Sequence, residues 1–428
     1  MIGSTAAERG LQVVGATVTP IAVVDPPLLN SIGVHQPYAL RAVVQVHTDA
    51  GITGLAEAYG DDPTLERLRR VIPELTGLDV FDIHGLTRRV SSALAGVEAD
   101  TPTELIGVAS VAKAVAATVA AFEVALFDIQ GKATGRRVCD LLGGAVRPAV
   151  PFSGYLFYKW AGHPGADPDE FGAALDPAGI VAQARYLVLT YGFRSLKLKG
   201  GVFPPDEEIA AIEALRAEFP DHPLRIDPNA NWTVPTSLAV AKRLDGVLEY
   251  LEDPTDGIAG MASVAAQTPI PLATNMCVTT FADVPRAVET DAVRIVLSDH
   301  HFWGGFRASL DLAAVCETFG LGLSMHSNTH LGISLAAMTH LAAATPLLTY
   351  ACDTHSPWQI EDVIEPGSVV IRDGEVAVPS GPGLGVTLDE DALGRLHEQY
   401  LRCGIRWRDD VTPMRAVSPD WTGARPRF

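Results

Sequence analysis

The sequence predicts an α/β protein in which a parallel (β/α) barrel follows a smaller N-terminal α+β domain. From about Pro148 onward, short apolar strands alternate with amphipathic helices at a period of roughly 25 residues, and right-handed crossovers close such a repeat into a barrel. Before that point the strand patterns come first and the helical patterns follow, which is typical of a segregated α+β domain.

The N-terminal domain begins with β-branched, alternating segments between about residues 11 and 58. Within them, the segment HTDAGITG predicts a hairpin that turns around Asp49, Ala50 and Gly51. Helical patterns follow over residues 64–94 and 102–134. The expected domain is therefore a small sheet followed by helices.

Composition argues against several classes of function. The net charge of −19 is unsuited to nucleic acids and to acidic membrane surfaces, which require clustered lysine and arginine. The most apolar stretch, Ile106 to Phe127, carries Lys113 and Glu123, so we interpret it as a buried amphipathic helix rather than a membrane span. The first ten residues lack an export pattern, and the cysteines form no CxxC pair, so we expect a cytoplasmic protein with free thiols.

The barrel region pairs each predicted strand with the helix that follows it. In chain order the pairs are FRSLKLKGG and PDEEIAAIEALRAEF, LRIDPN and TSLAVAKRL, LEYLEDP and MASVAAQ, PLATN and ADVPRAVE, VRIVLSD and RASLDLAAVCETF, and LGLSMHS and ISLAAMTHLAAA. After about Glu365 the composition returns to strands and turns, and a final helix, DEDALGRLHEQYLRCG, is expected to pack on the N-terminal domain. We therefore expect domains at residues 1–148 and 149–364, and a C-terminal segment at residues 365–428.

Polar side chains end successive predicted barrel strands, about one βα unit apart. They are Lys197 with Lys199, then Asp227, Glu252, Asn275, Asp299 and His326. The carboxyl ends of barrel strands meet at one face, where active sites of such barrels lie. We therefore expect these residues to converge on one cavity.

Three of these residues offer hard oxygen ligands: Asp227, Glu252 and Asn275. Two carboxylates and an amide oxygen suit Mg²⁺, with water and substrate completing the octahedron. Each residue taken alone could instead be a helix N-cap, a position that Asp and Asn favour. The spacing of the three favours the metal site.

Lys197 and Lys199 lie two residues apart on one strand, so both side chains point to the same face. On a central strand we expect burial and mutual repulsion to lower the basicity of both lysines. The alternative is an edge strand with a solvated lysine face.

Asp299 and His326 end neighbouring strands, and a carboxylate beside an imidazole fixes its tautomer and raises its basicity. A histidine in such a place can also be an ordinary polar residue with a satisfied hydrogen bond. Together with the lysines and the metal ligands, the dyad predicts removal of a proton next to a carboxylate, with bases on two sides of the α-carbon.

At this point the motifs SLKLKGG, DPNANW, LEDP, ATNM, SDHHFW, HSNTH, DTHSPW and RWRDD together resemble the enolase superfamily, and within it the glucarate dehydratase group. The resemblance covers nearly the whole chain from about residue 30. LKLK and EDP mark only the superfamily, whereas ATNM and HSNTH are more specific. The resemblance implies a (β/α)7β TIM-like barrel with an N-terminal α+β capping domain that the C-terminal segment completes.

The resemblance also implies roles. The three oxygen ligands would hold Mg²⁺, Lys199 would be the base on one face, and His326, paired with Asp299, the base on the other. Lys197 would neutralise the substrate carboxylate. His326 would also protonate the leaving β-hydroxyl, with Asn328 nearby, and the resulting enol would tautomerise to a keto-deoxy diacid.

Contacts to the rest of an acid sugar are implied for His35, Tyr155, Asn229, His355 and Arg408. An arginine fork suits a second carboxylate. The ordinary alternatives are a loop position for His35, a core position for Tyr155 and a surface ion pair for Arg408. Ala114 and Val115 fall where the family has a threonine contact, so one hydroxyl contact is expected to be missing.

Three functions compete. The first is a dehydratase of a six-carbon acid-sugar dicarboxylate, glucarate or a stereoisomer, in carbohydrate catabolism. An epimerase or racemase could use the same two bases without expelling water. A homologue that binds an acid sugar without turnover is the third, although a binder needs no pair of bases. We expect a homo-oligomer and no nucleic-acid or membrane partner.

Overall fold

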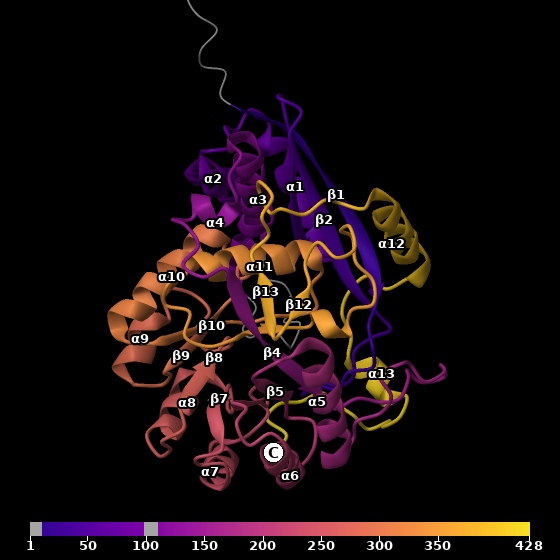
Figure 1. The fold of residues 1–428 in the computed structure, drawn as a ribbon, viewed down its shortest axis with the longest axis vertical. Coiled ribbons are helices and arrows are strands. Elements are labelled where there is room, and N and C mark those ends of the chain that lie inside the picture. Colours follow the sequence, from indigo (N-terminus) through magenta and orange to yellow (C-terminus); the bar gives the residue numbers. More distant parts are fainter. Residues whose placement is uncertain (1–10, 98–109) are drawn as a thin grey trace, which may run out of the picture.

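The computed structural model describes residues 11–97 and 110–428. Figure 1 shows a sheet-and-helix capping domain above a barrel, with the C-terminal helix α12 beside the capping sheet. This is the predicted fold class. The five cysteines are free, as expected.

The capping domain is a three-stranded antiparallel sheet in the order β1-β2-β3, followed by helices. The predicted hairpin is confirmed, because β2 and β3 pair across the turn at Asp49 to Gly51. The helical pattern of residues 64–94 is two helices, and part of the pattern of residues 102–134 lies outside the described residues. The elements are β1 (Val13–Val24), β2 (Tyr38–Thr48), β3 (Thr53–Tyr59), α1 (Asp62–Leu75), α2 (Ile83–Ala93), α3 (Val111–Thr134) and α4 (Val138–Leu141).

The barrel has eight parallel strands and seven intervening helices, in agreement with the prediction. Strands β4 to β10 pair in chain order, and β11 pairs with β4. The seam between β10 and β11 is closed by hydrogen bonds such as that from the Thr349 N–H to the Leu323 carbonyl, 3.0 Å. The strands are β4 (Ala149–Phe157), β5 (Leu196–Lys199), β6 (Leu224–Asp227), β7 (Leu248–Glu252), β8 (Leu272–Thr274), β9 (Ile295–Ser298), β10 (Gly322–Met325) and β11 (Cys352–Thr354).

The barrel helices begin and end at residues suited to those positions. Asp176 accepts a hydrogen bond from the Gly179 N–H at the start of α5, and Gly192 and Gly320 end α5 and α10 in the left-handed conformation. The helices are α5 (Pro177–Tyr191), α6 (Pro205–Glu218), α7 (Val234–Arg243), α8 (Gly257–Ala265), α9 (Val284–Glu289), α10 (Phe306–Phe319) and α11 (Gly332–Ala344).

The C-terminal segment contacts both parts of the molecule. Its helix α12 packs on β1, with His397 Nδ1 2.7 Å from the Pro20 carbonyl, whereas its hairpin β12–β13 pairs with barrel strand β4. Strands were expected in this segment, but their pairing with a barrel strand was not, and neither was the short helix α13 after α12. The domain boundaries stay predictions. The elements are the 3₁₀ turn η1 (Ser356–Trp358), β12 (Ile371–Arg372), β13 (Glu375–Ala377), α12 (Glu390–Cys403) and α13 (Val411–Arg415).

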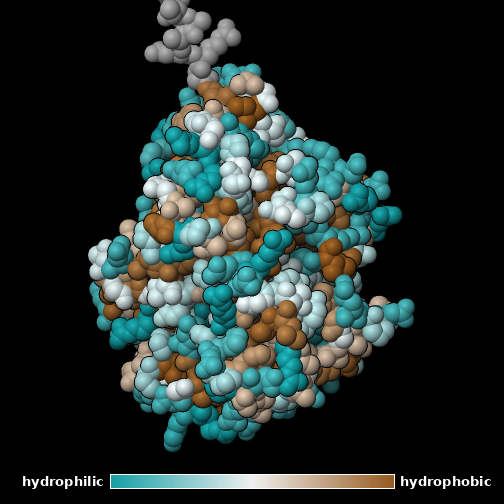
Figure 2. All heavy atoms as spheres, in the orientation of Figure 1, coloured by the Kyte–Doolittle hydropathy of each residue, from teal (hydrophilic) through white to brown (hydrophobic). Residues whose placement is uncertain are grey.

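The surface carries hydrophobic side chains scattered among hydrophilic ones, as Figure 2 shows for one face. Leu189 and Trp407 are 85% and 63% exposed, and single exposures of this kind are normal. Scattered exposed side chains do not identify a subunit interface, so the expected homo-oligomer stays a prediction. Among the helices of residues 11–97 and 110–428, none is both long and apolar enough to cross a bilayer.

A carboxylate from a buried ion pair of the capping sheet links that domain to the barrel. Glu57 on β3 accepts a hydrogen bond from Arg41 Nε at 2.7 Å, and both side chains are almost completely buried. The same carboxylate accepts the backbone N–H groups of Leu331 and Ser334, at the start of α11. A carboxylate at a helix N-terminus is favourable. The pair thus fixes the loop that follows His326.

Replacing Glu57 with glutamine is expected to lower the free energy of unfolding by about 3 kcal/mol, because Arg41 would remain as a buried charge without a counter-ion. Denaturant or thermal unfolding measures this. The matched control is Glu213→Gln, which removes an exposed pair with Arg243 and is expected to cost less than about 1 kcal/mol. Equal losses for the two variants would contradict this account.

Candidate active site

The predicted polar residues do lie at the carboxyl ends of the barrel strands. Lys199, Asp227 and Glu252 are the last residues of β5, β6 and β7. Asn275, Asp299 and His326 directly follow β8, β9 and β10, and His355 directly follows β11. Because the strands are parallel, these side chains share one end of the barrel.

A cluster of opposite charges fills the barrel below this end. Lys197 Nζ lies 2.6 Å from Glu252 Oε2 and 3.6 Å from Asp227 Oδ2. The same ammonium lies 2.6 Å from Asp353 Oδ2 and stacks over the Tyr155 ring, 4.7 Å from its centroid. Asp227 and Glu252 therefore reach one common position, that of the lysine ammonium.

Within this cluster, Glu252 is a carboxylate with too few hydrogen-bond donors around it. It is fully buried, and neither of its oxygens accepts a well-aligned hydrogen bond from any residue that the structure describes. Burial, together with the charges of Asp227 and Asp353, raises the pKa of Glu252 well above its usual value despite Lys197. An ionised carboxylate in such a place needs a further cation. The donor set of two carboxylates and an amide fits Mg²⁺.

The expected fall in the basicity of Lys197 is wrong. Burial alone would lower the pKa of its ammonium, but Asp353, Glu252, Tyr155 and Asp227 together raise it well above its usual value. The repulsion between the two lysines is outweighed because the strand ends beside them supply three carboxylates. Lys197 is therefore a fixed cation in this arrangement.

Lys199 belongs to the same cluster, because it shares Asp227 with Lys197. Its Nζ donates to Asp227 Oδ2 at 2.6 Å and to Asn229 Oδ1 at 2.9 Å. Asn229 has φ of 55° and is held by a hydrogen bond from its N–H to Asp227 Oδ1. Lys199 and Lys197 thus share the face predicted from their spacing.

The imidazole of His326 lies 3.2 Å from Asp299, measured from Nδ1 to Oδ2. Burial alone would raise the pKa of Asp299, but the hydrogen bond with His326 and the nearby imidazoles of His301 and His300 hold that pKa well below its usual value. An ionised Asp299 accepts, so Nδ1 of His326 carries the proton and Nε2 is left for other chemistry. The two side chains of the predicted dyad therefore lie within hydrogen-bond distance of each other.

Asn275 is positioned through its backbone, which is held by Asp253 of the loop after β7. Its backbone N–H donates to Asp253 Oδ2 at 2.9 Å, and Thr274 Oγ1 donates to Asp253 Oδ1 at 2.5 Å. The Asn275 side chain lines a small cavity together with Asp299 and His326. Asp253 therefore fixes the backbone at the residue predicted to supply the third oxygen ligand.

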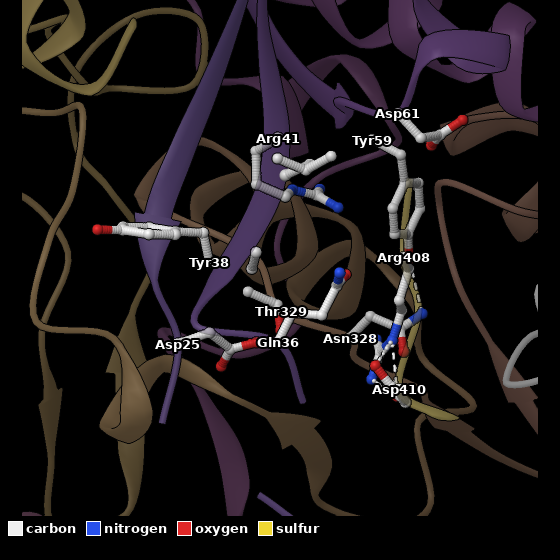
Figure 3. Close-up of a pocket in the computed structure, with 12 residues that line it drawn as sticks. Asp25, Gln36, Tyr38, Arg41, Tyr59, Asp61, Asn328, Thr329, Arg408 and Asp410 are labelled. Atoms are coloured by element: carbon white, nitrogen blue, oxygen red, sulfur yellow. Dashed lines mark hydrogen bonds and ion pairs between the residues drawn. The ribbon is translucent and has the colours of Figure 1, made fainter. Parts of the chain in front are cut away.

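Arg408 and Asn328 line a second cavity of about 70 Å³ between the capping sheet and the C-terminal segment (Figure 3). Arg408 donates to Asp410 through Nε and Nη2, and Asn328 Nδ2 donates to the Tyr59 hydroxyl at 2.6 Å. Arg408 is therefore fixed by an internal carboxylate and still faces the cavity.

The remaining predicted contacts form an aromatic wall. Tyr155 lies edge-on to His355, with ring centroids 5.0 Å apart, and its hydroxyl lies 3.3 Å from Asp227 Oδ2. His35 Nδ1 is 3.0 Å from Asp25 Oδ2, and the His35 ring lies edge-on to Phe157. Burial lowers the pKa of His355 well below its usual value. These rings are thus buried polar groups rather than surface ones.

Two buried charges beside the predicted residues were missed. Asp353 contacts Lys197 from the middle of β11, within the DTHSPW motif, so the rule that polar residues end strands did not select it. Lys113 of α3 lines the cavity of Asn275, Asp299 and His326. In the sequence it was only a charge within an apolar helix, so no pattern indicated this place. Ala114, where a threonine contact was expected to be missing, is buried next to it.

Comparisons with known proteins agree with this geometry. Residues 14–143 match the family model described as mandelate racemase / muconate lactonizing enzyme, N-terminal domain, and residues 179–392 match the model described as enolase C-terminal domain-like. A probable glucarate dehydratase of Streptomyces coelicolor is 53% identical over 98% of this chain and 100% of that protein.

Two solved structures resemble the whole chain. An enolase from Thermobispora bispora, complexed with magnesium and formate, has 60% identity and a TM-score of 0.96 over 98% of this chain and 100% of that one. An enolase from Mycobacterium smegmatis, complexed with tartrate, has 61% identity and a TM-score of 0.95 over 99% of this chain and 100% of that one.

Proposed function

We propose a reaction for this chain, which belongs to the mandelate racemase / muconate lactonizing enzyme family of the enolase superfamily: it is a Mg²⁺-dependent dehydratase of an acid-sugar dicarboxylate, glucarate or a stereoisomer. The observation that carries the proposal is the pair of proton-transfer candidates, Lys199 and His326, on opposite sides of a barrel mouth that also holds an under-compensated Glu252. The 53% identity to a probable glucarate dehydratase supports the reaction class.

Asp227, Glu252 and Asn275 would hold the Mg²⁺. A bound Mg²⁺ would neutralise the substrate carboxylate and so make the neighbouring C–H more acidic. The magnesium in the Thermobispora structure supports this ion. Lys197, buried among Asp227, Glu252 and Asp353, would hold these carboxylates in place through its ion pairs with them.

Lys199 would take the α-proton on one face of the substrate. Its Nζ is fixed in direction by hydrogen bonds to Asp227 and Asn229. To act as a base, Lys199 would have to be in its neutral amine form. The electron pair released from the C–H bond delocalises into the substrate carboxylate.

His326 would act on the other face. With Nδ1–H donated to Asp299, its protonated Nε2 can give a proton to the leaving β-hydroxyl, which departs as water. Loss of the α-proton and the β-hydroxyl leaves an enol that tautomerises to a keto-deoxy diacid. Asn328 lies two residues after His326 and donates a hydrogen bond to the Tyr59 hydroxyl. It would orient the hydroxyls next to the leaving group.

Contacts to the distal half of the substrate would come from Arg408, His35, Tyr155, Asn229 and His355. Arg408 is the residue suited to a second carboxylate, since a guanidinium donates in a fork. It lines the cavity with Asn328, so the distal end would extend toward the capping domain.

A panel of aldarates and aldonates with Mg²⁺ tests the proposal. We expect at least one six-carbon diacid to give a keto acid that reacts with semicarbazide, and we expect chelation with EDTA to lower this rate more than about 100-fold, because no residue replaces the charge of the cation. Adding Mg²⁺ back should restore activity.

Two other results would favour the competing functions. Inversion at the α-carbon or deuterium uptake from solvent without a keto acid would indicate an epimerase or racemase. Mg²⁺-dependent binding of a diacid by calorimetry, with no turnover across the panel, would indicate a protein that binds an acid sugar without catalysis. Either result would replace the dehydratase proposal.

A further inference from the structure

Residues 421–428 form a tail that returns to the barrel after α13; Figure 1 marks the end of this tail with C. The tail contacts the loop between β6 and α7, residues 228–233, which we call the barrel loop. The Arg427 N–H donates to the Asn231 carbonyl at 3.0 Å and to the Asn231 side chain at 2.9 Å. The Phe428 N–H donates to the same carbonyl at 3.2 Å. The tail is therefore hydrogen-bonded to the barrel loop through successive backbone groups.

The tail also contacts the loop between β1 and β2, residues 25–37, which we call the capping loop. Arg427 Nη2 donates to the Ser31 carbonyl at 2.9 Å. The Arg427 guanidinium lies over the Trp421 ring, 3.7 Å from its centroid, and Trp421 Nε1 donates to the Ile32 carbonyl. The tail thus joins a loop of the capping domain to a loop of the barrel.

The barrel loop has a backbone conformation that is uncommon without glycine. Asn229 and Ala230 have φ of 55° and 59°, in the left-handed region, and are 2% and 4% exposed. Residues other than glycine keep such a conformation only where the surrounding structure holds it. Arg425 Nη1 donates to the Asn229 carbonyl at 2.9 Å. The tail is therefore part of the structure that holds this loop.

Asn229 in turn holds the amine of Lys199. Lys199 Nζ donates to Asn229 Oδ1 at 2.9 Å, and Asn229 Nδ2 donates to Ser31 Oγ at 3.2 Å. The position of this amide therefore depends on the barrel loop and on Ser31 of the capping loop together. Because the tail is bonded to both loops, it fixes the position of one relative to the other.

We propose that the tail is a positioning element for Lys199. Residues 425–428 would hold the barrel loop against the capping loop, so that Asn229 directs the Lys199 amine toward the α-carbon of the substrate. The inference rests on the proposed function, because the role of Lys199 as a base comes from it. A reacting group displaced by about 1 Å can lose on the order of 100-fold in rate. His326 is held separately, by Asp299.

Exchange of the α-proton with solvent deuterium isolates the step assigned to Lys199. In His326→Asn, Lys199 would be the base that remains, and NMR in D₂O follows the exchange with saturating Mg²⁺ and the diacid that the panel identifies. In this background, we expect removal of residues 425–428 to slow the exchange about 30-fold or more. The matched control is Arg402→Ala, an exposed arginine on α12, which should leave the exchange rate unchanged.

A double-mutant cycle separates positioning from a general loss of stability. Asn229→Gly removes the amide and permits the left-handed backbone, so it should slow the exchange at least as much as the shortened tail does. If the tail acts through Asn229, shortening it in Asn229→Gly should change the rate by less than about threefold. Losses that multiply would overturn the inference. So would an unchanged rate in either single variant, measured well below its thermal midpoint.

Arg427→Ala gives the same test if the shortened chain does not fold. It removes the hydrogen bond to Ser31 and keeps the backbone of the tail. We expect the exchange to slow about fivefold, and Arg427→Lys, which keeps a charged donor, should stay within about twofold of the parent. A folded Arg427→Ala variant that exchanges like its parent would contradict the inference.

A crystal structure of the shortened chain tests the positioning without turnover. We expect Asn229 Oδ1 and Lys199 Nζ, which are 2.9 Å apart in the intact chain, to separate beyond hydrogen-bond distance. If the intact enzyme neither exchanged nor dehydrated any diacid, the proposed function would be wrong, whereas this separation would still support the positioning. Normal turnover by the shortened chain, with the hydrogen bond kept, would contradict the positioning and support the proposed function.

Discussion

His326→Asn is expected to lower the rate of dehydration at least about 10³-fold. Asparagine can occupy a similar volume but cannot give a proton to the leaving hydroxyl at neutral pH. In the structure, the hydrogen bond between Nδ1 and Asp299 leaves Nε2 as the nitrogen for this proton transfer. The rate of keto acid formation, followed by its reaction with semicarbazide, measures the fall in dehydration rate.

The same variant should keep a partial reaction. Because Lys199 lies on β5, across the barrel from His326, exchange of the α-proton with solvent deuterium should continue, as NMR in D₂O would show. The matched control is His84→Asn, an exposed histidine on α2, which should turn over like the wild type. Normal dehydration by His326→Asn would show that another residue is the acid.

Asn275→Ala is expected to weaken Mg²⁺ binding about 100-fold, which corresponds to about 2.7 kcal/mol. The variant removes one of three oxygen ligands, and the loop geometry that Asp253 imposes on residue 275 offers no substitute. Isothermal titration with Mg²⁺ measures the change. Asn275→Asp, which returns an oxygen with added charge, should bind Mg²⁺ at least as tightly as the wild type.

A control for this prediction lies in the same cavity. Thr279→Val keeps the volume of a side chain that lines the cavity beside Asn275 but is no proposed ligand, so its affinity for Mg²⁺ should stay within about threefold. Equal losses in Thr279→Val and Asn275→Ala would mean that the cavity wall, rather than the amide oxygen, sets the affinity.

The barrel could be predicted from the sequence because its period is local. Strands β5 to β10 each carry a polar residue at the carboxyl end or directly after it, and each is followed by a helix. Asp227, Glu252 and His326 could therefore be assigned to one face without any knowledge of their distances. The hairpin β2–β3 was predictable for the same reason, since its turn lies within the segment itself.

Features that depend on contacts far apart in the chain were not predictable. The prediction of a lowered pKa for Lys197 was wrong because that pKa depends on Asp353, which is 156 residues away in the sequence. The hairpin β12–β13 pairs with β4 through backbone hydrogen bonds, which leave no pattern in the side chains. Lys113 was overlooked for a similar reason, because an apolar helix does not reveal which barrel loop it will cover.

The roles of the site residues rest on one physical claim, that three oxygen donors at neighbouring strand ends share a single cation. A crystal structure with Mn²⁺ in place of Mg²⁺, with anomalous scattering to locate the ion, tests this most directly. We predict one strong peak bonded to Asp227, Glu252 and Asn275. A peak instead at Asp299, His300 and His301, whose potential ligand atoms lie within 4.8 Å of one another, would contradict the claim and the mechanism built on it.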